Sequence, residues 1–147
     1  MAANTEAITA ARFSITIDGY EIASFSELQG ITTSVEVVDQ YESSDTSVIH
    51  RKHPGRAAPP TITLKRGKNA SMELWSWHEA VLMGDMAAAR RSCSLVMYAA
   101  DGRPVARYHM EHAWPAKIEI GGLKAGASEM LMETVTLVCE HIQRVAP

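Results

Sequence analysis

The segment from Thr61 to Trp77, which reads Thr-Ile-Thr-Leu-Lys-Arg-Gly-Lys-Asn-Ala-Ser-Met-Glu-Leu-Trp-Ser-Trp, limits the possible folds more than any other. Its first residues alternate between apolar and polar side chains, which is typical of a strand with one buried face. Gly67 then breaks the strand, and the following residues change to the spacing of an amphipathic helix. The sequence therefore predicts a helix that packs on the flank of a β-sheet.

The predicted helix covers residues 70–83. Asn69 is a suitable N-cap because its side chain can accept a hydrogen bond from a free backbone N–H group. Gly84 is a suitable C′ residue because glycine readily adopts the left-handed conformation that ends many helices. The large side chains fall on one arc of this helix, which we expect to pack on the sheet. With a tryptophan from the last third of the chain, the predicted structural core is Leu74, Trp75, Trp77, His78, Val81 and Trp114.

Alternating apolar and polar residues predict strands along most of the chain. The predicted strands cover residues 13–17, 20–28, 33–39, 61–64, 92–98, 105–114, 117–120 and 130–142. Asp18-Gly19 and Asp101-Gly102 are hairpin turn signals. Gln29-Gly30, Pro115 and Gly121-Gly122 are expected to break strands. About eight strands and one helix predict a mainly β fold, an antiparallel sandwich or barrel with a flanking helix.

Regular periodicity disappears between residues 40 and 60. Ser43-Ser-Asp-Thr-Ser, His53-Pro-Gly and Pro59-Pro60 interrupt this stretch. A loop of this length in a compact domain is uncommon and is usually functional or disordered. We therefore expect residues 40–60 to form a docking loop and residues 1–11 to form a flexible N-terminal arm. The whole chain, 1–147, is expected to be one domain.

The formal net charge of −3 hides a strong asymmetry along the chain. Residues 1–48 contain eight acids against the single base Arg12, whereas residues 50–68 contain six bases and no acid. Three interpretations remain open: contact with nucleic acid, complementarity between copies of the chain, and two solvated faces without a partner. The segment 50–68 contains no Phe, Tyr or Trp, which counts against a grip on nucleic acid through base stacking.

The sequence contains no pattern typical of a metal or catalytic site. His109 and His112 are three residues apart on a predicted strand, so their side chains point to opposite faces. His50 and His53 flank two cationic residues, which is a repulsive setting for a metal ion. The chain lacks the Gly-x-Ser-x-Gly motif of a serine nucleophile, and Gly67-Lys68 lacks the upstream glycine of a phosphate-binding loop. We expect no enzymatic activity, no cofactor and no metal.

Two further features concern the compartment of the protein. Cys93 and Cys139 lie in apolar strand patterns, and we expect two buried thiols rather than a disulfide. The sequence contains neither an apolar run long enough to span a membrane nor a signal peptide. We therefore expect synthesis in the cytoplasm and no membrane anchoring.

Three motifs in this order and spacing resemble one protein family. They are Ile-Thr-Leu-Lys-Arg-Gly at 62–67, Leu-Trp-Ser-Trp at 74–77 and Ala-Trp-Pro-Ala-Lys at 113–117. Weaker echoes occur at 52–55 and 133–141. The chain resembles the inner tube protein of contractile phage tails and of phage-derived contractile injection particles, from about Phe13 to Ile142. It departs from the family pattern at Tyr41–Asp45 and at Glu140-His141.

The resemblance implies a fold of two roughly perpendicular antiparallel β-sheets with a flanking helix. It also implies a structural role: six copies form a ring, and the rings stack into a rigid hollow tube. Implied partners are a surrounding sheath protein, baseplate and terminator or cap proteins, and a cargo of DNA or effector protein. The chain would assemble in the cytoplasm and then belong to a virion tail or a phage tail-like injection particle. The tube protein of type VI secretion systems and a nucleic-acid-binding β-barrel are the alternatives.

Two sets of residues are candidates for these contacts. The docking loop and the acidic strand before it predict a subunit or ring interface at Glu36, Asp39, Tyr41, Glu42, Arg51, Lys52, His53 and Arg56. Strands around 21–28, 33–39, 92–99 and 104–112 are expected to form the channel wall because each has a polar face. The predicted lumen residues on these strands are Ser24, Ser26, Ser34, Glu36, Arg107, His109 and Glu111.

Overall fold

The computed structural model describes residues 9–67, 72–121, 126 and 131–147. Strands dominate it, as the sequence predicts. The elements are β1 (Arg12–Ile17), β2 (Tyr20–Phe25), β3 (Glu27–Ser43), β4 (Val48–Gly67), α1 (Glu73–Leu82), α2 (Met86–Ala89), β5 (Arg91–Tyr98), β6 (Pro104–Ile120), β7 (Met132–Val138) and β8 (His141–Val145).

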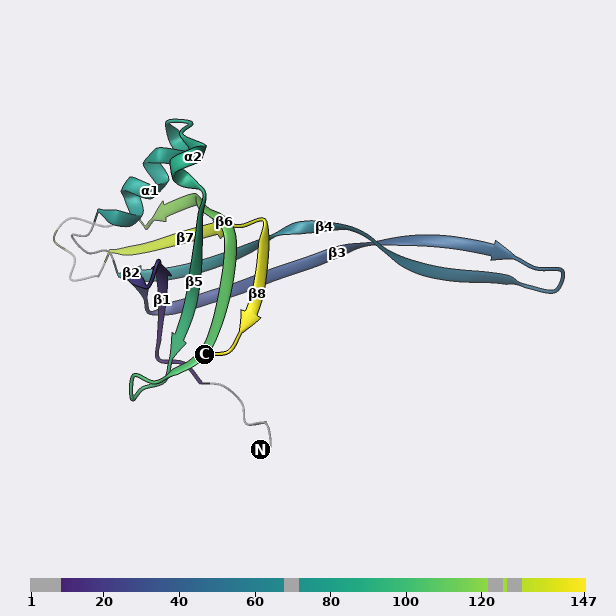
Figure 1. Ribbon diagram of the computed structural model, residues 1–147, viewed down its shortest axis with the longest axis horizontal. Coiled ribbons are helices and arrows are strands. Elements are labelled where there is room, and N and C mark those ends of the chain that lie inside the picture. The colour runs from purple at the N-terminus through teal and green to yellow at the C-terminus, as the bar shows by residue number, and fades with distance from the viewer. Residues whose placement is uncertain (1–8, 68–71, 122–125, 127–130) are drawn as a thin grey trace.

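The long strand β6 joins two antiparallel groups of strands. Its residues up to Ala113 pair with β5, and those from Trp114 onward pair with β7. The first group runs β2-β1-β5-β6 with β8 on the other side of β6, and the second runs β6-β7-β4-β3. The two groups run in crossing directions in Figure 1, which agrees with the expected pair of crossing sheets. His112, with a positive φ of 51°, lies where β6 passes from one group to the other.

The hydrophobic core lies between the two groups. In β7 and in residues 60–67 of β4 every second residue is buried. The central side chains of the core include Ile15, Phe25, Ile62, Leu64, Leu95, Met110, Val135 and Leu137. The helix α1 adds its buried face to the same cluster. This arrangement follows from the period-2 pattern, because alternate side chains of a strand point to opposite faces.

One ion pair lies inside this core. Arg66 Nε and Glu133 Oε2 are 3.2 Å apart, and their side chains are 5% and 2% exposed. The guanidinium of Arg66 also lies over the ring of Phe25, 5.5 Å from its centroid. Removing either charge would leave the other buried without a partner, which typically costs about 3–5 kcal/mol. The pair therefore ties β4 to β7 beneath β2.

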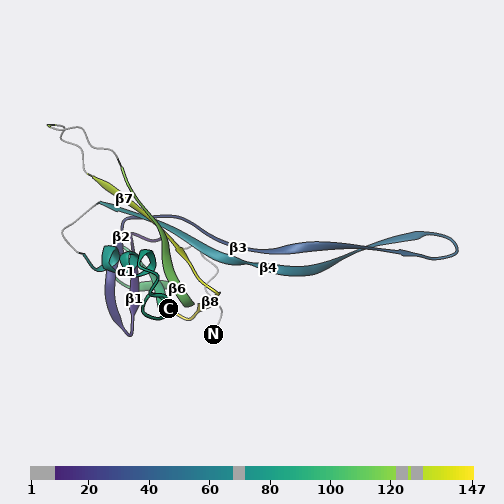
Figure 2. The same cartoon turned by 90° about the horizontal axis from the view of Figure 1, so that it is seen from above.

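The prediction of a loop at 40–60 was wrong. Residues 40–43 continue β3 and residues 48–60 belong to β4, with a tight turn in which Ser44 N–H donates to Ser47 O at 2.7 Å. Figures 1 and 2 show this hairpin extending far from the body. Residues 32–59, which we call the arm, are all exposed. Because neither face of the arm is buried, its sequence lacks the alternation by which strands are recognised.

The arm twists strongly along its length, and its two strands cross near the middle in Figure 1. The register shifts between Val35 and Val37. Gly55 packs closely against the facing strand, because a Cβ there would lie 2.8 Å from Cγ2 of Val38. Glycine at this position therefore permits the close approach of the two strands.

Other predicted boundaries were only partly correct. β3 continues through Gly30 and β6 continues through Pro115, each with only a register shift at that point. The predicted strand 130–142 is two strands, β7 and β8. The turn at Asp18-Gly19 is confirmed, and so is the positive φ of Gly84 at the end of α1. The predicted N-cap, Asn69, lies outside the described residues.

Candidate assembly surfaces

The arm brings the acidic and basic segments of the chain together. Arg51 Nε lies 2.9 Å from Glu42 Oε2, and Lys52 Nζ lies 3.3 Å from Asp39 Oδ1. Nε2 of His50 is also 3.0 Å from Asp39 Oδ1. The charge complementarity seen in the sequence is thus met between two strands of one chain. All of these groups are exposed, so each pair contributes little to stability.

Large apolar side chains are exposed on both faces of the arm. Tyr41 is 69% exposed and stacks on His50, with ring centroids 4.5 Å apart. The others are Val35, Val37, Val38, Val48 and Ile49, which are 42–69% exposed. Clusters of exposed apolar side chains are typical of surfaces that bind a protein, a membrane or a ligand. Tyr41 was predicted from the sequence as an interface residue. The valines were not, although Val35, Val37 and Val38 lie in the predicted strand 33–39.

The predicted interface residues all lie on this arm, within residues 36–56. Glu36 and Arg56 lie on its proximal part, and His53 is the register partner of Val38. β3 is the last strand of the second group, so no other strand of the described chain pairs with its outer edge. An unpaired strand edge is a template for pairing with another chain. The predicted interface residues thus lie on an exposed arm with an unpaired strand edge. Their role in an interface remains a prediction.

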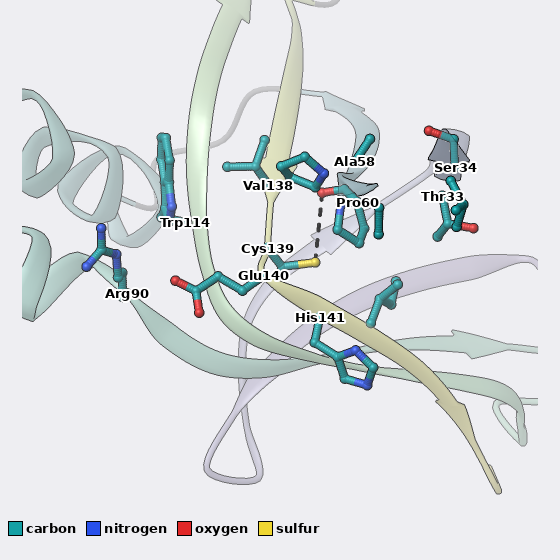
Figure 3. A pocket seen from close by; sticks show the side chains of 14 residues that line it. Thr33, Ser34, Ala58, Pro60, Arg90, Trp114, Val138, Cys139, Glu140 and His141 are labelled. Carbon is teal, nitrogen blue, oxygen red and sulfur yellow. Dashed lines mark hydrogen bonds between the residues drawn. The ribbon is translucent and has the colours of Figure 1, made fainter. Parts of the chain in front are cut away.

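A groove of about 730 Å³ lies at the root of the arm (Figure 3). Pro60, Trp114, Val138 and Ile142 give it an apolar lining. Glu140, His141 and Arg90 also line it. Trp114 was expected in the core, but it is half-buried and lines this groove instead.

The structure confirms three of the predicted core residues of the helix. Leu74, Trp77 and His78 are buried. The indole N–H of Trp77 donates to Ala89 O at 2.6 Å, and Nδ1 of His78 lies 2.8 Å from Pro115 O. These bonds satisfy the polar atoms that burial would otherwise penalise. The structure thus gives His78 a structural role, holding α1 against β6.

Trp75 was also expected in the core, and this prediction was wrong. Its side chain is 38% exposed, and its ring lies edge-on to His78 with the centroids 6.0 Å apart. Val81 is half-buried. Two tryptophans separated by one residue are about 200° apart around a helix, so one sheet cannot bury both.

The predicted lumen residues do not share one face. Ser24, Arg107 and His109 lie on the outward side of the first group of strands, where His109 Nδ1 is 3.4 Å from Ser94 Oγ. Ser26 lies between β2 and β3, and its backbone N–H donates to Lys65 O. The remaining residues are Ser34 and Glu36 on the arm and Glu111 opposite β8.

Both cysteines are free and buried, as expected. Burial, with a smaller contribution from Cys139, raises the pKa of Cys93 from 9.0 to about 12. Burial also raises the pKa of Cys139. Because the thiolate is the reactive form, both thiols are poor nucleophiles at neutral pH.

The described residues contain no cluster of three or more His, Cys, Asp or Glu side chains that could hold a metal ion. Within the same residues, no helix is long and apolar enough to cross a membrane.

A protein-family model described as T4-like virus tail tube protein gp19 matches residues 9–143. The chain belongs to this tail tube family. Its match spans both groups of strands, the arm and α1. The tube proteins of this family are structural proteins. No curated protein matches the sequence.

Solved structures share the tail tube fold at low sequence identity. A chain from the sheath–tube complex of an extracellular contractile injection system (PVC, extended state) has a TM-score of 0.78 and 16% identity, covering 97% of this chain and 94% of that one. A chain from the anti-feeding prophage baseplate has a TM-score of 0.73 and 19% identity, covering 98% of both. A type six secretion system protein has a TM-score of 0.59 and 13% identity, covering 92% and 83%. These likenesses establish the fold of the chain.

Proposed function

We propose that this tail tube protein assembles into hexameric rings that stack into a rigid hollow tube. Membership of the tail tube family carries this proposal. The arm supports it, because 28 consecutive exposed residues, 32–59, with several apolar side chains are costly for an isolated chain. Neighbouring copies that cover the arm would remove this apolar surface from water. The protein acts as a structural conduit, without catalysis and without a cofactor.

The tube works inside a larger particle. Chains of similar fold occur in a sheath–tube complex, in a baseplate and in a tube-terminating cap. By analogy, a sheath surrounds this tube, a baseplate starts it and a terminator or cap closes it. Contraction of the sheath drives the tube through a target envelope, and the lumen conducts DNA in a virion or effector protein in an injection particle. Subunits assemble in the cytoplasm before they become part of the particle.

The proposal is tested by electron microscopy and sedimentation of the purified protein at high concentration. We expect rings or tubes. Replacing Val37 and Val48 on the arm by lysine should prevent assembly and leave the monomer folded, because both side chains are 60% or more exposed. Tyr20→Lys on β2, at a side chain that is 78% exposed and lies on neither the arm nor α1, is the matched control. A protein that stays monomeric at every concentration, and also with baseplate added, would disprove the assembly.

A further inference from the structure

The second group of strands presents an open face that is rich in threonine. Its side chains form transverse rows across β3, β4, β7 and β6. One row is Glu27-Lys65-Thr134-Glu119, the next is Gly30-Thr63-Thr136-Lys117, and the third is Thr32-Thr61-Val138-Trp114. We call this the threonine face.

The opposite side of the same strands is the core. Ile62, Leu64, Val135 and Leu137, which alternate with the threonines, are at most 1% exposed. The threonines of β4 and β7 are half-exposed. Among the described residues, none of the large apolar side chains with high exposure belongs to these rows. Those side chains lie mainly on the arm and on α1, which are therefore the better candidates for surfaces that become buried on assembly.

The charges on the threonine face are balanced. Lys65 is the register partner of Glu27, and Lys117 Nζ lies 3.6 Å from Glu119 Oε2. The rows thus contain two bases and two acids. Such a surface is well hydrated and attracts neither polyanions nor polycations strongly.

Two strands of this face extend into the arm, the surface that the proposed function places against neighbouring copies. β3 and β4 continue without a break from the threonine face into the arm (Figures 1 and 2). Within the described chain, the group has unpaired edges along β3 and along residues 114–120 of β6. If the arm contacts other copies, this face is continued from one subunit to the next, and it makes an uninterrupted wall.

We infer that the threonine face lines the channel of the tube, an inference that rests on the proposed function. The cargo then passes along a neutral, hydroxyl-lined wall that does not retain it. This assignment differs from the lumen predicted from the sequence, which placed Ser24, Arg107 and His109 at the wall. Those side chains lie on the other group of strands.

Labelling of assembled tubes with reagents of two sizes tests the assignment. Cysteine is introduced at Thr63 or at Thr136, and Ser24→Cys on the first group of strands is the matched control. A small maleimide can enter the channel, whereas a maleimide carried on a large polyethylene glycol cannot. The native thiols are buried and contribute only a background, measured on the unsubstituted protein.

In tubes, we expect the small reagent to label Thr63→Cys and Thr136→Cys and the large one to label neither. Both reagents should label both variants before assembly. At Ser24→Cys the two reagents should label the tubes equally.

Labelling of Thr136→Cys in tubes by the large reagent would overturn the assignment, and so would protection of Thr136→Cys from both reagents. Exclusion of only the large reagent at Ser24→Cys, but not at the threonine variants, would also overturn it. If both threonine variants fail to form tubes while the unsubstituted protein does, the face packs against another subunit and the assignment is wrong. Absence of tubes from the unsubstituted protein would instead contradict the proposed function.

Discussion

At the scale of single residues, the polar atoms inside this protein are satisfied within its own fold. Trp77 and His78 each bond a backbone carbonyl, of Ala89 and Pro115 respectively, and Arg66 pairs with Glu133. Among the described residues, no buried side-chain nitrogen or oxygen lacks a partner. Removing one partner would leave the other buried and unsatisfied, which is strongly destabilising. The role of these polar groups is to hold the helix and the strands in one arrangement, as a structural protein requires.

The two tryptophans of α1 provide a matched pair at this scale. Trp77→Ala removes a buried indole and should lower the free energy of unfolding by about 3–5 kcal/mol. Trp75→Ala truncates a side chain that is 38% exposed and should cost about 1 kcal/mol or less. Chemical denaturation of the unassembled protein measures both. Equal losses of stability for the two variants would contradict the burial described here.

At the scale of elements, the arm is a two-stranded hairpin that extends beyond the core. Such hairpins are only marginally stable by themselves. Three features favour this one: continuity with the core strands β3 and β4, the close approach at Gly55, and the cross-strand ion pairs. An arm that is already ordered loses less conformational entropy when it binds a neighbour.

The ion pairs of the arm give a prediction about pairing within one chain. Reversing Arg51 and Lys52 to glutamate should hinder assembly, because it places four acids together on the arm. Reversing Glu42 and Asp39 to lysine in the same chain should restore assembly. Mixing two singly reversed proteins should not restore it, because each pair lies within one chain. Sedimentation of the variants and of the mixture measures the difference, and rescue by mixing would show that the pairs form between copies.

At the scale of the whole molecule, the fold cancels the charge asymmetry of the sequence. The arm contains four acids and three Lys or Arg residues, and its two strands place the acidic segment beside the basic one. Lys65 lies beside Glu27, and Arg66 is buried against Glu133. Among the described residues, the basic segment 50–67 therefore does not form an isolated cationic surface.

This neutralisation predicts weak binding to nucleic acid. In a gel-shift assay with duplex and single-stranded DNA, the unassembled protein should bind at the weak end of the non-specific range, with a Kd of about 10⁻⁴ M or weaker at physiological salt. A salt series distinguishes a tube subunit from a nucleic-acid-binding barrel, because the affinity of a protein that contacts many phosphates falls steeply as the salt concentration rises. Tight, salt-sensitive binding by the monomer would favour the nucleic-acid-binding barrel instead.

The sequence by itself determined the features that come from local periodicity and turn chemistry. Alternation predicted the core strands, Gly84 ended the helix and Asp18-Gly19 made the first turn. The alternation exists because one face of each core strand is buried. The glycine signals exist because the turn and the end of the helix need a positive φ. Both kinds of signal can be seen in consecutive residues.

Only the tertiary structure decided the features that depend on segments far apart in the sequence. The arm gave no periodic signal because neither of its faces is buried, and residues 40–60 therefore read as a loop. The side of α1 that is buried, the pairing of Arg66 with Glu133 and the pairing of Lys52 with Asp39 depend on which strands become neighbours. The threonine face emerged only when the register of β3, β4, β7 and β6 aligned its rows. The sequence of one strand does not determine which strand lies beside it. The contacts of a charge or a hydroxyl on that strand are therefore set by the fold.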